Sequence, residues 1–175
     1  MYKGISNKNS TMSLPVPMLN IMNGGCHANN NVDIQEFMII PSNKFNFKDG
    51  LMKSVEVYTN LKSLLKEKGL SVSVGDEGGF APNLKTSEEV LDLIILSIER
   101  AGLIYLDDMS IALDCAASEL FSEDSYKLTG ENKKFSSDEM VFYMQALVDK
   151  YEIKSFEDPF DEKDWDAWKT FTKNN

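Results

Sequence analysis

The chain has 175 residues, of which 42% are hydrophobic and 10% aromatic, and this composition allows one medium-sized domain with a substantial core. Its formal net charge is −10, and Arg100 is its single arginine. This balance argues against a nucleic-acid-binding protein or adhesion to an anionic membrane, because both need a basic surface.

Residues 1–13, MYKGISNKNSTMS, form a polar lead without the apolar core of a signal peptide. Two short apolar runs follow, LPVPMLNIM at 14–22 and IQEFMIIP at 34–41, and both predict buried strands. Pro15 and Pro17 make the start of the first run an extended entry or an edge. The Gly- and Asn-rich stretch between the runs predicts a loop.

Helical spacing of apolar residues then predicts four helices. They cover 51–65 with a stop at Gly69, 86–102 behind a Thr86-x-x-Glu89 capping box, 136–148 behind a Ser136-x-x-Glu139 capping box, and a last one beginning at 164. The runs 110–117 and 153–160 between these helices predict two more buried strands. From residue 110 onward, the alternation of strands and helices therefore indicates parallel strands of an α/β fold.

In two of these runs an acid ends the first part of the strand: Asp114 follows IAL, and Glu157 follows IKSF. Parallel α/β domains place their chemistry at the carboxyl ends of strands, so both carboxylates could converge on one rim. Such acids suit Mg²⁺, which takes one or two carboxylates together with water and substrate oxygens. The alternative is that each is a helix N-terminal charge or a solvated loop acid.

The loop VGDEGGFAPN, residues 74–83, exposes Glu77 between glycines, where no bulky neighbour prevents close approach to a ligand. Near a second carboxylate and away from water, the pKa of Glu77 would rise and make it a proton donor. The alternative is a turn whose acids face solvent. His27, the sole histidine, lies in a polar loop, and of the adjacent residues Gln35 and Glu36 at most one should face a ligand unless a bulge intervenes.

Cys26 and Cys115 lie in unrelated contexts without a C-x-x-C pair, which predicts free thiols inside the cell. No apolar run approaches the roughly 20 residues of a membrane helix, so we expect a soluble protein without a membrane span.

Four segments in order, LPVPMLNIMNGGCHANNNVDIQEFMIIP, VGDEGGFAPN, ALDCAASE and SFEDPFDEKDW, closely resemble the enolase family. The resemblance runs from about residue 14 to the end. It implies that 14–175 are part of the C-terminal barrel domain, with strand-strand-helix-helix followed by βα units. A closed barrel of eight strands typically takes about 250 residues, so we expect an incomplete TIM barrel in which the N-terminal α+β domain is absent.

By matched position, the resemblance implies the reversible dehydration of 2-phospho-D-glycerate to phosphoenolpyruvate, a step of glycolysis. Glu77 would be the proton donor, His27, Gln35 and Glu36 would surround the substrate, and Asp114 and Glu157 would bind Mg²⁺. The family's later acidic ligand, lysine base and cationic phosphate grip are not found in these residues. We therefore expect the 175-residue fragment to be inactive alone.

The resemblance further implies a cytoplasmic protein, with a secondary presence at the cell surface, and a homodimer at full length. A truncated, non-catalytic binding or scaffold protein is the alternative function. Another enzyme of the same superfamily is a weaker alternative, because the DEGG and QEF segments match enolase itself better.

Overall fold

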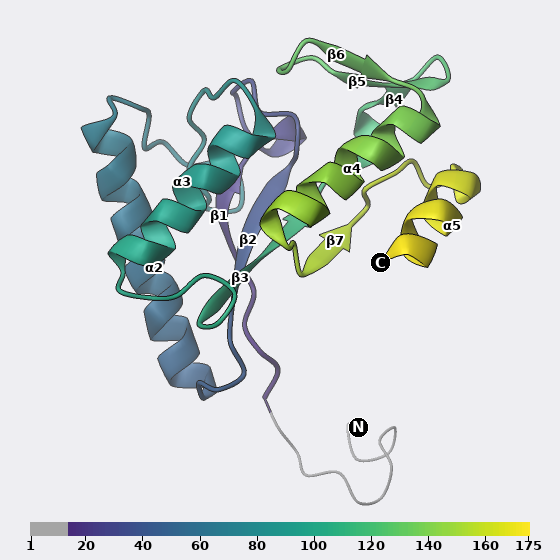
Figure 1. The fold of residues 1–175 in the computed structure, drawn as a ribbon. Coiled ribbons are helices and arrows are strands. Elements are labelled where there is room, and N and C mark those ends of the chain that lie inside the picture. Colours follow the sequence, from purple (N-terminus) through teal and green to yellow (C-terminus); the bar gives the residue numbers. More distant parts are fainter. Residues whose placement is uncertain (1–13) are drawn as a thin grey trace, which may run out of the picture.

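The structure is a computed structural model whose described residues are 14–175, so the polar lead predicted for 1–13 lies outside the described residues. Figure 1 shows a central sheet flanked by helices, with a smaller sheet at one end. The elements in chain order are β1 (Leu19–Asn23), a 3₁₀ turn (Gly25–His27), β2 (Glu36–Pro41), α2 (Phe47–Glu67), α3 (Ser87–Arg100), β3 (Met109–Asp114), a second 3₁₀ turn (Ala117–Glu119), β4 (Phe121–Ser122), β5 (Ser125–Leu128), β6 (Lys133–Phe135), α4 (Ser137–Tyr151), β7 (Ser155–Glu157) and α5 (Trp165–Asn174).

The main sheet has the strand order β1-β2-β3-β7. β1 and β2 are antiparallel, β2 and β3 are antiparallel, and β3 and β7 are parallel, as the alternation of strands and helices after residue 110 predicts. The helix α4 provides the crossover between the two parallel strands. Residues 14–175 thus form a mixed α/β structure without a closed barrel, which confirms the predicted incomplete barrel.

The core lies between the main sheet and the helices. Phe37, Ile39, Ile111 and Leu113 of the central strands are fully buried, and α2 and α3 present apolar residues at helical spacing to the same cluster. The helix α2 contacts β2 and α3, while α4 contacts α5 and the small sheet. This packing holds β2 and β3, which carry two of the predicted site residues, in the middle of the sheet.

The helix starts follow their capping residues. Ser136 and Glu139 form the complete predicted capping box of α4. Thr86 caps α3, but the Glu89 carboxylate accepts from the backbone N–H of Lys85 at 2.8 Å instead of that of Thr86. α2 begins at Phe47, earlier than the predicted 51, because the side chain of Asn46 accepts from the backbone N–H of Asp49 and caps the helix there.

The strands are shorter than predicted, for identifiable backbone reasons. Residues 14–18 lie outside the sheet, which agrees with the inability of Pro15 and Pro17 to donate to a strand ladder. Ala116 and Asp158 take φ values of 43° and 44°, so β3 and β7 end before residues 117 and 160.

The small antiparallel sheet β4-β5-β6 was not predicted from the sequence. Its first turn places Glu123 and Asp124 at φ 53° and 55°, between the paired residues Ser122 and Ser125. Two-residue hairpins of this kind usually carry Asn or Gly, so a Glu-Asp turn gives little signal in a sequence.

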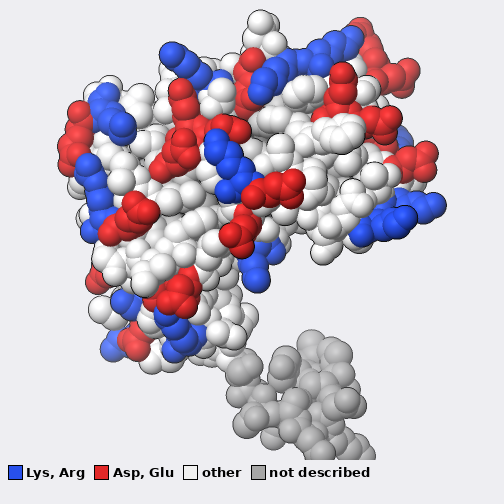
Figure 2. Space-filling view, in the orientation of Figure 1, with Lys and Arg blue, Asp and Glu red and all other residues white. Residues whose placement is uncertain are grey.

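Acidic and basic side chains intermix on the helix-covered face in Figure 2. Ion pairs join neighbouring elements, for example Lys150 with Glu88 and Arg100 with Glu67, both at 2.7 Å. Among residues 14–175, no helix is both long and apolar enough to cross a membrane.

Candidate active site

One polar residue from each strand of the main sheet lies in a single lateral row. Asn23 of β1 is opposite Glu36 of β2, Glu36 is opposite Asp114 of β3, and Asp114 is beside Glu157 of β7. Paired residues on adjacent strands project to the same side of a sheet, and the strands are about 4.8 Å apart. The fold thus brings three carboxylates that are far apart in the sequence to the same end of three neighbouring strands.

Backbone contacts fix the ends of β3 and β7 against each other. The N–H of Cys115 donates to the carbonyl of Glu157 and that of Ala117 to the carbonyl of Asp158, both at 2.9 Å. The side chain of Asp114 accepts from the N–H of Ala116 at 3.0 Å through Oδ1. These bonds leave Oδ2 of Asp114 and the exposed carboxylate of Glu157 at the same rim.

The loop that carries Glu77 docks along the outer edge of β1. The N–H of Phe80 donates to the carbonyl of Ile21 and the N–H of Asn23 to the carbonyl of Phe80, both at 2.9 Å. The N–H of Asp76 donates to the carbonyl of His27 at 3.0 Å, which joins this loop to the Gly- and Asn-rich loop. Docking on β1 brings Glu77 towards Glu36 of the neighbouring strand.

His27, Glu36 and Glu77 form a compact cluster, with one ligand atom from each within 4.8 Å of the others. Nδ1 of His27 is 3.3 Å from Oε1 of Glu77 and 3.8 Å from Oε1 of Glu36, and neither approach has hydrogen-bond geometry. The other oxygen of Glu77 accepts a hydrogen bond of 2.9 Å from Nδ2 of Asn20. Glu77 therefore faces the cluster, in contrast to the alternative of a turn acid turned wholly to solvent.

Glu36 and Glu77 have pKa shifts in opposite directions, and the shift of Glu77 is the reverse of the one that the sequence predicts. Burial, a hydrogen bond with Glu77 and the negative charges of Glu77, Asp114 and Glu157 raise the pKa of Glu36 to about 8. The hydrogen bond from Glu36, helped by Asn20 and His27, lowers the pKa of Glu77. The prediction of a raised pKa was wrong because Glu36, with a side chain 14% exposed against 39% for Glu77, is the more buried partner, and burial therefore raises the pKa of Glu36 instead.

Burial and like charges raise the pKa values of the other two carboxylates of the row. Burial raises the pKa of Asp114, with further contributions from Asp158 and Glu77. The charge of Asp114, followed by burial, raises the pKa of Glu157. Within residues 14–175, no lysine or arginine forms an ion pair with either carboxylate. Two adjacent carboxylates with free oxygens match the donor set of Mg²⁺, so these residues fit such an ion.

Gln35 lies outside the carboxylate cluster. It lines a neighbouring cavity of about 200 Å³ together with Cys26 and Cys115, and its backbone carbonyl accepts from the N–H of Gly24 at 2.9 Å. Both cysteines are free thiols, as predicted, and Cys115 is buried.

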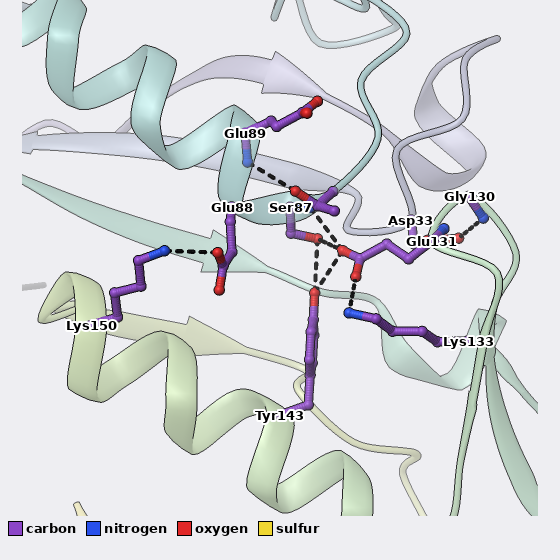
Figure 3. A network of polar contacts seen from close by, with 10 residues as sticks. Asp33, Ser87, Glu88, Glu89, Gly130, Glu131, Lys133, Tyr143 and Lys150 are labelled. Carbon is purple, nitrogen blue, oxygen red and sulfur yellow. Dashed lines mark hydrogen bonds and ion pairs between the residues drawn. The ribbon is translucent and has the colours of Figure 1, made fainter.

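A network of polar contacts joins Asp33, which lies between His27 and Glu36 in the sequence, to the small sheet and two helices (Figure 3). Asp33 accepts from the N–H groups of Gly130 and Glu131, at 2.9 and 3.0 Å. The Glu131 carboxylate, whose side chain is 3% exposed, accepts from both the N–H and the hydroxyl of Ser87 and from the hydroxyl of Tyr143, all at 2.8 Å. The network ties the segment between His27 and Glu36 to the small sheet, α3 and α4.

The structure thus gathers five of the six residues that the sequence singles out, His27, Glu36, Glu77, Asp114 and Glu157, and places Gln35 beside them. Sequence reasoning missed Asn20, which contacts Glu77, and Asp158, whose charge acts on Asp114 and Glu157. Asp158 stands next to Glu157 in the sequence, which was an available signal. Asn20 gave none, because a polar residue inside an apolar strand run has many structural roles.

Comparison with known proteins gives a consistent result. Residues 11–175 match the family described as "Enolase, C-terminal TIM barrel domain". Proteins named "Enolase" from the Lens, Corby and Paris strains of Legionella pneumophila are each 50% identical to the chain over 166 residues. The match covers 95% of this chain and 39% of each relative, so the chain spans about two fifths of the length of these curated relatives.

Proposed function

This chain belongs to the enolase family, and on that premise we propose that it carries the metal-binding and proton-donating part of a dehydratase site. The proposed reaction is the Mg²⁺-dependent, reversible conversion of 2-phospho-D-glycerate to phosphoenolpyruvate and water, as in glycolysis. One observation supports it most: Glu77 clusters with His27 and Glu36, with ligand atoms within 4.8 Å of one another, beside the row that continues from Glu36 into Asp114 and Glu157.

In this proposal Asp114 and Glu157 hold Mg²⁺ through their carboxylate oxygens. The bound ion would stabilise the negative charge that builds up when a proton is removed next to the substrate carboxylate, as it does in enolase-superfamily sites generally. The protein's part is to keep both ligands at rigid strand ends, where their side chains need little ordering on binding.

Glu77 transfers a proton to the departing hydroxyl, the carbon–oxygen bond breaks, and the hydroxyl leaves as water. The shared proton of the Glu36–Glu77 pair supplies this step, because Glu36 remains protonated at neutral pH and passes its proton along the hydrogen bond to Glu77. In this proposal His27, which is 3.3 Å from Glu77, would contact the substrate, and Gln35 would approach it from the neighbouring cavity.

We also propose that residues 1–175 alone bind Mg²⁺ but do not turn over substrate. A phosphate site recruits Arg or Lys in fixed geometry, whereas Arg100 pairs with Glu67 on the helical surface. The remaining proposals follow the family: a cytoplasmic location with a secondary presence at the cell surface, and a homodimer of the full-length protein.

The sharpest test is a chimera in which these residues replace the matching 166 residues of a Legionella pneumophila enolase. The chimera should convert 2-phosphoglycerate with Mg²⁺, measured by phosphoenolpyruvate absorbance, whereas the 175-residue chain should give no such signal. Glu77→Gln and Asp114→Asn should each reduce the chimera's kcat by at least about 100-fold, and Asp107→Asn, at a remote exposed acid, should not. A folded but inactive chimera would favour the non-catalytic scaffold alternative.

A further inference from the structure

We propose that Asn20 is a positioning residue that holds the Glu77 carboxylate in the orientation needed for proton transfer. The inference rests on the proposed dehydration and deepens it, because it assigns a role in that site to a residue of β1, a strand that carries none of the predicted site residues.

The two oxygens of Glu77 have different neighbours. Oε2 accepts the 2.9 Å hydrogen bond from Nδ2 of Asn20, and Oε1 lies 3.3 Å from Nδ1 of His27. The Glu77 side chain is 39% exposed, so packing alone does not select its rotamer. The bond from Asn20 directs one oxygen towards β1 and leaves the other towards His27 and Glu36.

The side chain of Asn20 packs against the loop that carries Glu77. A Cβ atom at Gly79 would lie 2.9 Å from Oδ1 of Asn20 and 2.5 Å from Oδ1 of Asn23, so both amides pack directly against the Gly79 backbone. Neither Oδ1 atom has a hydrogen-bond partner among residues 14–175, although both are buried. Unpaired buried acceptors are unfavourable for folding and call for an explanation. For Asn20, the hydrogen bond from its Nδ2 to Glu77 supplies that explanation.

The backbone of the Glu77 loop has its own supports. The hydroxyl of Tyr58 donates to the carbonyl of Gly78 at 2.8 Å, and its ring stacks on Phe80 with centroids 4.3 Å apart. Together with the bond from the Asp76 N–H to the His27 carbonyl, these contacts hold the loop without Asn20. Replacing Asn20 should therefore release the Glu77 side chain while the loop stays in place.

The chemical role follows from the direction of the bond. An N–H donor stabilises the Glu77 carboxylate, which is the form present after the proton has been given away. Asn20→Asp keeps the shape but replaces the donor with a second carboxylate, which disfavours the Glu77 anion. Asn20→Leu keeps the approximate volume and removes the donor without adding charge.

The primary test is ¹³C NMR titration of the Glu77 carboxyl in the 175-residue chain. Asn20→Asp should move its midpoint upward by about one pH unit, and Asn20→Leu should move it upward by less. Asn60→Asp is the matched control, because Asn60 lies on α2 and bonds only the Glu56 carbonyl, so it should leave the midpoint unchanged. An unmoved midpoint in a folded Asn20→Asp chain would overturn the proposal. If Asn20→Leu fails to fold, the isosteric Asn20→Asp still decides.

The chimera separates this inference from the proposed function. There, Asn20→Leu should lower kcat by about tenfold with KM changed less than about twofold, and Asn20→Asp should shift the pH profile as well. An unchanged kcat in Asn20→Leu would overturn the positioning role even if the NMR contact holds. An inactive parent chimera together with a shifted Glu77 titration would instead reject the dehydration and keep the Asn20–Glu77 contact.

Discussion

Asp114 and Glu157 lie side by side in parallel register on β3 and β7, and the charge of Asp114 is the largest cause of the raised pKa of Glu157. Two acids that repel each other at fixed positions store unfavourable electrostatic energy in the folded chain. A divalent cation between them would remove it.

We therefore expect the chain to bind Mn²⁺, used as a paramagnetic substitute for Mg²⁺, at this pair. NMR signals near Asp114 and Glu157 should broaden selectively, and Asp114→Asn should weaken the binding by at least about tenfold. Asp107→Asn serves as the control, because Asp107 is an exposed acid that pairs with Lys44. Equal broadening in wild type and Asp114→Asn would contradict a site at this position.

Glu36 predicts a specific pH dependence of stability. Its pKa rises from 4.5 to about 8 in the folded state, so the folded state binds the proton more tightly than the unfolded state does. Its contribution is fully present below about pH 4.5 and is lost as pH rises towards 8. Glu36→Gln should remove this pH-dependent loss of stability and raise the free energy of unfolding at pH 9 by roughly 2 kcal/mol relative to wild type. Each pKa unit corresponds to about 1.4 kcal/mol, and the lowered pKa of Glu77 offsets part of the effect of Glu36. Urea denaturation at pH 6 and pH 9 measures the difference, which should shrink when Mg²⁺ is added.

Glu131 should show the opposite pH dependence. Burial alone would raise its pKa, but hydrogen bonds from Lys133, Ser87 and Tyr143 outweigh burial and lower it. Its stabilisation is present above the unfolded-state pKa and disappears as pH falls through the folded-state value. Glu131→Gln should lower the free energy of unfolding by about 2 kcal/mol at pH 7 and by less in acid, again by urea denaturation.

Glu123→Gln provides the comparison for Glu131, because Glu123 is 79% exposed and pairs only with Lys127. This change should alter stability by less than about 0.5 kcal/mol. If Glu131→Gln and Glu123→Gln changed the free energy of unfolding equally, the buried network would contribute no more to stability than an exposed ion pair does.

Gly130 should tolerate no side chain. A Cβ atom there would overlap the backbone carbonyl of Asn31, because the turn between β5 and β6 lies directly against the segment before Asp33. Gly130→Ala should destabilise the chain by about 3 kcal/mol or more, through displacement of that backbone. At Gly69, where the φ is 70° and no atom lies within 4 Å of the Cβ position, Ala should cost only about 1 kcal/mol from backbone strain. Thermal denaturation of both variants provides the measurement.

The sequence predicts the helices of this fold better than its strand pairing. Capping residues and apolar spacing locate α3 and α4, because these signals are local. The ends of β3 and β7 depend on two residues in left-handed conformations, Ala116 and Asp158. Neither residue type predicts such a conformation from the sequence. The small sheet escapes prediction for the same reason, since Glu123 and Asp124 form its turn.

The candidate site shows the same division. The residue types that carry chemistry are visible in the sequence, but the row from Asn23 to Glu157 depends on register between strands up to 134 positions apart. The direction of the Glu77 pKa shift depends on which carboxyl is the more buried, and periodicity contains no such information. The contact from Asn20 likewise requires the docking of one loop on the edge of β1.

The bonds from Gly130 and Glu131 to Asp33 join positions 97 and 98 residues apart. During synthesis, the segment that carries His27 and Glu36 must wait for nearly another hundred residues before its supports exist. Closing so long a loop is slow, so we expect the segment that carries His27 and Glu36 to reach its final position late in folding, after α2 and α3 have formed. A nascent chain halted before residue 130 would hold both Glu36 and Glu77 and yet lack the two bonds that anchor Asp33, three residues before Glu36.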